Sequence, residues 1–217
     1  MIHVETGIIQ PMTFDSYHEY LTGHLSPSRR QHSLGVMQVM EELASVYGLD
    51  PKAAQIAGLL HDAGKEFPLS RMISIAGTLG YPLIHPQDRD PLYLHGPASA
   101  YVAQHELGIV DPLILEAIFR HSYVGDGPVQ SPVFCWCLRF ADLLEPGRDW
   151  DAVRERTRPV ILAGQMGKAA WMLLDWLLPF LQDMGVSLHP SQVILHQKLI
   201  LIHENGHAPV ANGELPV

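Results

Sequence analysis

The sequence predicts an all-α protein, a bundle of helices, and three observations support this fold class. Apolar residues recur every three or four positions through most of the 217 residues, which is the period of an amphipathic helix. Prolines begin several of these segments and glycines follow their ends, as is typical of helix termini. The alternation that indicates a strand is confined to residues 2–10, where a short arm or hairpin edge is expected.

The predicted helices follow one another with short connections. In the longest, residues 28–47, the apolar positions recur until Gly48 ends the helix. The next helix starts with Asp50 as its N-cap and Pro51 at its first position, and it continues to His61. Further helices are predicted over residues 70–79, 97–107, 112–121, 132–144, 167–182 and 191–203.

The length of the chain favours one domain with short ends. At roughly 100–200 residues per domain, a chain of 217 residues buries a substantial core without disulfides. We expect an N-terminal arm at residues 1–12, a helical domain at 13–204 and a mobile tail at 205–217. The two cysteines, Cys135 and Cys137, point to nearly opposite sides of one predicted helix, so we interpret them as packing residues in a reducing compartment.

Charge and hydropathy exclude two classes of partner. Fourteen Lys and Arg against 23 Asp and Glu give a formal net charge of −9, so the chain has no basic surface for bulk nucleic acid. The most apolar stretch, residues 169–181, contains Asp175 and Pro179 and is shorter than the roughly 20 residues of a membrane span. Residues 1–12 lack the features of a signal peptide. The sequence therefore predicts a cytoplasmic protein with no membrane partner.

Histidine is the unusual component of the sequence, with 13 residues. The pair His61-Asp62 ends a helix that is expected to be buried, and Asp142 interrupts an apolar helix, so both carboxylates need a compensating charge. A metal ion would provide that charge. The candidate ligands are four imidazoles and two carboxylates: His32, His61, Asp62, His95, His121 and Asp142. This set suits one or two borderline transition metal ions better than magnesium, which prefers oxygen ligands.

Each candidate ligand also has a purely structural interpretation. The carboxylate of Asp62 could cap a helix end, and His121 could interact with the dipole of its own helix. Asp142 could pair with Arg139 or with Arg148. It is the joint pattern, rather than any single residue, that favours a metal site.

That joint pattern resembles the HD superfamily of metal-dependent phosphohydrolases. Its signature is a distant His, then His-Asp, then a distant Asp on a helical bundle, and here these are His32, His61-Asp62 and Asp142. The sequence around them resembles the bacterial YqeK-type symmetrical diadenosine tetraphosphate hydrolases, with the clearest likeness at residues 29–36, 57–62, 94–97 and 141–149. The resemblance extends over about residues 14–204, and it implies an HD-domain helical bundle.

The resemblance also implies a set of metal ligands. One ion would be held by His32, His61, Asp62 and Asp142, and Asp62 would bridge to a second ion held by His95 and His121. A carboxylate has the lone pairs for such a bridge, whereas a neutral imidazole does not. Two divalent transition metal ions are therefore expected, iron first, with manganese, cobalt or zinc as alternatives.

The reaction that the resemblance implies is hydrolysis of a phosphoanhydride bond in a nucleotide substrate. Hydroxide activated by two metal ions would cleave diadenosine tetraphosphate into two ADP, with Asp62 and Lys65 as catalytic residues. Lys65 would also bind the phosphate chain, and Arg29 and Arg148 are weaker candidates for the same contact.

Three alternatives stay open at this point. The chain departs from the family at residues 122–125, where Thr-Thr-Gly is common, so an HD-type phosphohydrolase of another nucleotide is one of them. A non-catalytic nucleotide-binding regulatory domain is the second, although a complete ligand set argues against it. Oxidation at a di-iron centre is the third, and Lys65 with the two arginines favours a phosphate substrate over it. The oligomeric state is also open, with a homodimer as one alternative.

Overall fold

The computed structural model describes residues 13–122 and 129–204. Its helices are α1 (Phe14–His24), α2 (Pro27–Tyr47), α3 (Pro51–Leu60), α4 (Leu69–Thr78), η1 (Pro86–Arg89), α5 (Pro91–His105), α6 (Pro112–Arg120), α7 (Pro132–Leu144), α8 (Asp151–Leu162), α9 (Met166–Asp183) and α10 (Pro190–Glu204). Those described residues form ten α-helices and one short 3₁₀ helix, η1, without a strand, which confirms the predicted all-α fold. The expected arm at 1–12 with its strand at 2–10, and the expected tail at 205–217, lie outside the described residues.

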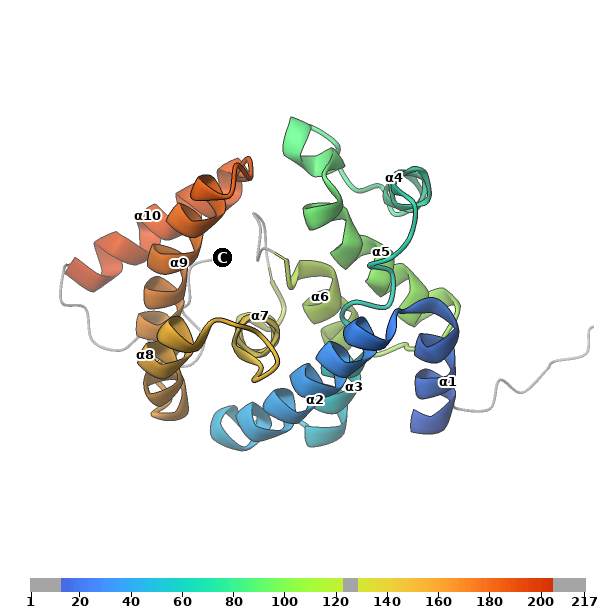
Figure 1. Cartoon of the computed structure of the whole chain (residues 1–217), viewed down its shortest axis with the longest axis horizontal. Helices are drawn as coiled ribbons and strands as arrows, with labels where there is room; N and C mark the ends of the chain where they lie inside the picture. The colour runs from blue at the N-terminus through green and yellow to red at the C-terminus, as the bar shows by residue number, and fades with distance from the viewer. Residues whose placement is uncertain (1–12, 123–128, 205–217) are drawn as a thin grey trace, which may run out of the picture.

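Helix α7 lies near the centre of the molecule, with other helices packed around it (Figure 1). α2 packs along α3 and against α7, and α6 contacts α3, α5 and α7. On one side of α7 lie α8, α9 and α10, and on the other lie α4 and α5 (Figure 1). One large apolar core runs through these helices, and a smaller one joins α4 to α5.

The expected start of one helix, at residue 97, is wrong. α5 begins at Pro91, and Pro97 lies inside it. The reason is a strong N-terminus, because the Asp90 carboxylate accepts a hydrogen bond from the Leu92 amide and a proline occupies the first helical position. As a consequence, His95 lies within a helix and not in the loop before it.

Two helices have no counterpart in the sequence prediction, because each buries only a narrow stripe. α1 buries Tyr17 and Leu21, which lie one turn apart. α8 is mostly polar and buries Val153, Thr157 and Ile161, which are spaced four residues apart. A stripe of this width produces no clear helical period in a sequence.

Two glycines allow the helices that carry histidines to approach one another closely. A Cβ atom on Gly58 of α3 would lie 2.8 Å from the Cα atom of Met37 in α2. A Cβ atom on Gly96 of α5 would lie 2.6 Å from the carbonyl oxygen of Phe119 in α6. Both distances are far below van der Waals contact, so a larger residue would push the helices apart. The two contacts join α2 to α3 and α5 to α6.

The most apolar stretch of the sequence forms part of α9. Its Leu173, Leu174, Leu177 and Leu178 are buried in the large core, as expected of a core helix. In the ranges that the structure describes, no helix has both the length and the apolar character needed to cross a membrane.

Both cysteines lie buried in α7 as free thiols. Burial raises the pKa of the Cys135 thiol to about 12, and it also raises the pKa of the Cys137 thiol well above its usual value. The two side chains pack in the large core, as the sequence predicts.

Candidate metal centre

The six candidate ligands come from separate parts of the chain and meet in the interior. Their positions are α2 for His32, the end of α3 for His61 and Asp62, α5 for His95, the end of α6 for His121, and α7 for Asp142. Four of them are buried, and His32 and Asp142 are partly buried. The packing of α2, α3, α5, α6 and α7 therefore assembles the whole set that the sequence singles out.

His32, His61 and Asp142 form the first group of candidate ligands. The Nε2 atom of His32 lies 2.9 Å from Asp142 Oδ1 and 3.3 Å from His61 Nε2. The Nε2 atom of His61 lies 3.6 Å from the same carboxylate oxygen and 3.7 Å from Asp62 Oδ2. Donor atoms of four side chains thus face one small space.

His95 and His121 form the second group, next to the other oxygen of Asp62. Their Nε2 atoms are 2.8 Å apart. Asp62 Oδ1 lies 3.3 Å from His95 Nε2 and 3.6 Å from His121 Nε2. Asp62 therefore turns one oxygen toward each group, as a bridging carboxylate would.

Backbone carbonyls orient three of the four imidazoles. The Nδ1 atom of His61 lies 2.8 Å from a carbonyl oxygen in the preceding turn, and the corresponding distances are 3.0 Å for His95 and 2.7 Å for His121. Because a carbonyl oxygen only accepts hydrogen bonds, each Nδ1 carries the proton and each Nε2 presents its lone pair to the centre. This outer hydrogen bond is a common companion of a metal-binding histidine.

Two observations show that the centre fits a bound cation. The Oδ2 atom of Asp62 is buried and accepts no hydrogen bond from the described residues, with the Arg29 guanidinium 3.5 Å away, and a buried carboxylate oxygen without a hydrogen bond is costly. The lone pairs of His95 and His121 face one another, and a shared cation would remove their repulsion. Imidazole nitrogens with carboxylate oxygens are also a donor set that transition metals accept.

Both carboxylates of the centre are held in the charged form. Burial by itself raises the pKa of Asp62, but the Lys65 ammonium and the neighbouring imidazoles hold it well below its usual range. Burial also raises the pKa of Asp142, but Arg148 and a hydrogen bond from His32 outweigh it and hold that pKa well below its usual range. Two buried negative charges require cations close by.

The second group of histidines is neutral. Burial lowers the pKa of His95 well below its ordinary value, and the Lys65 ammonium lowers it further. Burial likewise lowers the pKa of His121. For His61 burial acts in the same direction, but the two carboxylates of the centre raise its pKa above the ordinary value. Neutral imidazoles at His95 and His121 have lone pairs available for a metal ion.

Glu145, which was not among the candidates predicted from the sequence, also contacts the centre. Its Oε1 atom lies 3.0 Å from His32 Nδ1 and orients that imidazole as the carbonyls orient the other three. The Gly147 amide donates to Oε2 at 2.6 Å, and a Cβ atom on Gly35 would lie 2.5 Å from the same oxygen. Two glycines therefore make room for a buried carboxylate. The available signal in the sequence was an acidic residue one helical turn after Asp142.

Glu145→Ala is expected to weaken metal binding at the first group by about 10–100-fold, because His32 loses the hydrogen bond that orients it. Glu145→Gln keeps an acceptor oxygen for His32 and should lose less. Titration of the metal-stripped protein with Co²⁺ measures both effects. Equal affinities in the wild type and both variants would show that Glu145 does not orient the ligand.

The structure brings Lys65 directly to the second group. Its Nζ atom lies 2.8 Å from His95 Nε2 and 3.7 Å from Asp62 Oδ1. Burial lowers the pKa of Lys65, while Asp62 acts in the opposite direction. The Lys65 side chain is 21% exposed, so its ammonium borders both the candidate ligands and solvent.

The two predicted arginines also lie at the centre. Arg29 is 3.5 Å from Asp62 Oδ2, and Arg148 is 2.6 Å from Asp142 Oδ1. Of the two partners left open for Asp142, the structure therefore shows Arg148. Arg139 instead donates to backbone carbonyls at the end of α6. The Arg29 and Arg148 side chains are partly exposed, which leaves them within reach of a ligand.

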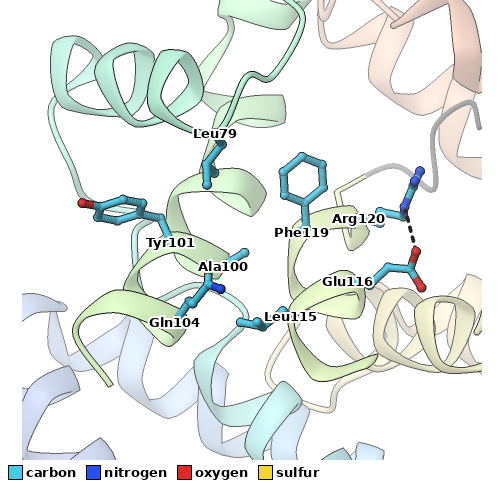
Figure 2. A pocket seen from close by; sticks show the side chains of 8 residues that line it. All are labelled: Leu79, Ala100, Tyr101, Gln104, Leu115, Glu116, Phe119 and Arg120. Atoms are coloured by element: carbon cyan, nitrogen blue, oxygen red, sulfur yellow. Dashed lines mark ion pairs between the residues drawn. The ribbon is translucent and has the colours of Figure 1, made fainter. Parts of the chain in front are cut away.

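A groove that contains none of the candidate ligands lies between α5 and α6 (Figure 2). Its volume is about 260 Å³. Its lining residues are Leu79, Ala100, Tyr101, Gln104, Leu115, Glu116, Phe119 and Arg120. Glu116 and Arg120 form an ion pair at 3.7 Å, drawn as a dashed line in Figure 2.

The family model of the HD domain matches residues 29–158, which are more than half of the chain and include all six candidate ligands. This chain belongs to the HD domain family. The residues that match the HD domain include both groups of histidines described above. The family match ends before α9 and α10.

Known relatives of this HD domain protein cover most of its length. A symmetrical bis(5'-nucleosyl)-tetraphosphatase of Bacillus subtilis is 35% identical over 131 residues, which are 60% of this chain and 68% of the relative. An enzyme of the same name from Halalkalibacterium halodurans is 30% identical over 182 residues, which are 82% of this chain and 92% of the relative. A crystal structure from Clostridium acetobutylicum, described as a predicted HD superfamily hydrolase involved in NAD metabolism, has a TM-score of 0.78 and 32% identity. The match covers 88% of this chain and 99% of that one.

Proposed function

We propose that this HD domain protein is a metal-dependent phosphohydrolase that cleaves diadenosine tetraphosphate into two molecules of ADP. The observation that carries the proposal is Asp62, which turns one oxygen toward each of two groups of histidines. Two relatives at 30–35% identity are named symmetrical bis(5'-nucleosyl)-tetraphosphatases, which supports the choice of substrate. One water molecule is consumed: its oxygen bonds to one of the middle phosphorus atoms, and the bridging P–O bond between the second and third phosphates breaks.

Two divalent transition metal ions suit the donor set. The proposed ligands are His32, His61, Asp62 and Asp142 for the first ion, and Asp62, His95 and His121 for the second. In support, ligand atoms lie within 4.8 Å of one another in each of three sets: His32 with His61 and Asp62, His61 with His121 and Asp142, and Asp62 with His95 and His121. Iron is the first choice, with manganese, cobalt and zinc as alternatives. When bound, such a pair supplies Lewis acidity and lowers the pKa of water at the reacting phosphorus.

The cationic side chains of the chain hold and stabilise the phosphates. Lys65 lies at the second group before substrate arrives, so its ammonium is already placed to offset the negative charge that develops at phosphorus. Arg29 and Arg148 are partly exposed and pair with the two carboxylates, so they can turn to the nonbridging oxygens of a bound nucleotide. Lys65 is therefore proposed as a catalytic residue and the two arginines as substrate-binding residues.

The products formed from diadenosine tetraphosphate show which phosphoanhydride bond the protein cleaves. If the site holds a nucleoside diphosphate on one side of the broken bond, chromatography of the reaction will show ADP alone. The physical reason is that a fixed metal pair engages one phosphoryl group, so the cations beside it select which bond breaks. ATP together with AMP would reject the symmetric register while leaving a phosphohydrolase.

Lys65→Ala is expected to lower turnover by about 100-fold, because one charge that stabilises the transition state is lost. Both metal ions should stay bound at least as tightly as before, since the ammonium lies 2.8 Å from His95 Nε2 and competes for that lone pair. Lys52→Ala, which changes an exposed lysine on α3, is the matched control. Loss of metal from Lys65→Ala would show that Lys65 serves the metal site rather than the substrate.

Two alternatives are separated by a hydrolysis assay on a panel of nucleotides. Faster cleavage of another nucleotide would replace the substrate but keep the enzyme class. Binding without cleavage by the metal-loaded protein would favour a regulatory nucleotide-binding domain. The cytoplasmic location and a homodimer stay predictions, which cell fractionation and light scattering check.

A further inference from the structure

A buried carboxyl–imidazole pair joins the C-terminal helices to the segment before α5. His189, in the turn before α10, places Nε2 2.9 Å from Oδ1 of Asp88 in η1. Each of the two side chains is only 4% exposed. His189 lies outside residues 29–158, which the HD domain matches, and the reaction proposed above gives the pair no role.

Hydrogen bonds define the tautomer of His189. The Ser191 amide donates to Nδ1 at 3.1 Å, so Nδ1 carries no proton and Nε2 donates its proton to Asp88. The other oxygen of Asp88 accepts a hydrogen bond from the His85 amide at 2.6 Å. All four polar atoms of the pair therefore have a defined partner, and the pair fixes both the distance and the direction between the two segments.

The same turn is bonded to α5 close to His95. The His189 amide donates to the hydroxyl of Tyr93 at 3.0 Å, and Tyr93 is fully buried. The Tyr93 hydroxyl lies 3.3 Å from the Ser187 carbonyl oxygen and 3.3 Å from Gln192 Oε1. Tyr93 and His95 belong to the first two turns of α5, so the network holds the part of the helix that carries a candidate ligand.

Gln192 extends the network to the end of α6. Its Nε2 atom lies 3.4 Å from the carbonyl oxygen of Ser122, the residue that follows His121. The start of α10 therefore contacts both segments that carry the second group of ligands. Arg139 of α7 donates to the same Ser122 carbonyl, but none of the hydrogen bonds of this network contacts His32, His61 or Asp142 of the first group.

We propose that His189 is a positioning residue which, through Asp88 and Tyr93, holds His95 and His121 in place for the second metal ion. This inference rests on the proposed function, which assigns that ion to the second group. His95 is oriented by the carbonyl of Pro91, the first residue of α5, and the first turn of a helix lacks intrahelical partners for its amides. The hydrogen bonds of His189 to Asp88 of η1 and to Tyr93 would keep the first turn of α5 in one position, and with it the imidazole of His95.

Simple attachment of the C-terminal helices does not require a buried polar pair. Burial of such a pair costs desolvation, and well-packed apolar side chains often stabilise a junction equally well. The same two segments are also linked at the surface, where Gln87 Nε2 donates to Ser187 Oγ at 2.7 Å. What the buried pair adds is the fixed orientation of η1 relative to α10.

Titration of the metal-stripped full chain with Co²⁺, followed by visible absorption, tests the proposal. The wild type is expected to bind two equivalents. In His189→Ala the second equivalent should bind about 10–100-fold more weakly while the first keeps its affinity. Ser187→Ala removes only the surface link between the same segments, so it is the matched control and should bind both ions like the wild type.

Two further variants keep the test decisive. His189→Gln retains a side-chain N–H that can donate to Asp88, so it should recover most of the affinity. Tyr93→Phe removes a single hydroxyl and should weaken the second equivalent in the same direction, which answers the question if His189→Ala does not fold. Equal weakening of both equivalents, unchanged binding of both, or only one equivalent in the wild type would overturn the positioning role.

Hydrolysis measured on the same samples separates this inference from the proposed function. A wild type that binds two Co²⁺ ions but cleaves no nucleotide would contradict the proposed function. Selective loss of the second ion in His189→Ala would still support the positioning role in that case.

Discussion

Asp62→Ala is expected to release both metal ions and to reduce hydrolysis of diadenosine tetraphosphate to the detection limit. Asp62 Oδ2 lies 3.7 Å from His61 Nε2, and Oδ1 lies 3.3 Å from His95 Nε2, so one substitution removes a ligand from both groups. It also removes one of the two carboxylates that balance the charge of two divalent ions. Elemental analysis of the purified variant gives the metal content directly.

His95→Ala is the informative comparison, because it should lose chiefly the second ion and keep the first. Asp183→Ala changes an exposed acid at the end of α9 and should keep both ions, which controls for the loss of a carboxylate as such. Full metal occupancy in Asp62→Ala would contradict the bridging assignment. Loss of both ions in His95→Ala would contradict the division into two groups.

Removal of the metals by a chelator is expected to lower the midpoint of thermal unfolding by at least about 8–16 °C, which is the contribution of one tightly bound ion. A ligand present at 1,000 times its Kd stabilises the folded state by about 4 kcal/mol, and each kcal/mol shifts the midpoint by about 2–4 °C in a domain of 150–250 residues. The proposed ligands come from five helices or their ends, so bound ions would join parts of the chain that are far apart in sequence. Differential scanning calorimetry measures the shift.

The chelated protein should remain folded, because one large core runs through the helices independently of the metal centre. Addition of metal should restore the midpoint. Asp62→Ala, already without metal, should show no shift when the chelator is added. An unchanged midpoint after verified removal of metal from the wild type would show that the ions lie at the periphery.

Local patterns in the sequence were sufficient to predict the fold class, which the structure confirms, and to single out six candidate ligands, which the structure brings together. Helical periodicity, N-caps and prolines depend on residues a few positions apart, so most helices could be predicted without knowledge of their neighbours. Asp62 and Asp142 were recognisable because a carboxylate in an apolar helical segment needs compensation. The errors in the predicted helices also have local causes. The N-cap Asp90 starts α5 six residues before Pro97, the predicted start. The apolar stripes that α1 and α8 bury are too narrow to give a recognisable helical period.

The sequence by itself was enough to predict a metal centre, because four imidazoles and two carboxylates on helices are a donor set that transition metals accept. Only the tertiary structure decided which oxygen of Asp62 faces which histidines, and which outer residues hold the ligands. Glu145 contacts His32 from 113 positions away, and His189 contacts Asp88 from 101 positions away. Such contacts leave no periodic trace in the sequence, because they depend on how the helices pack and on the direction of individual hydrogen bonds.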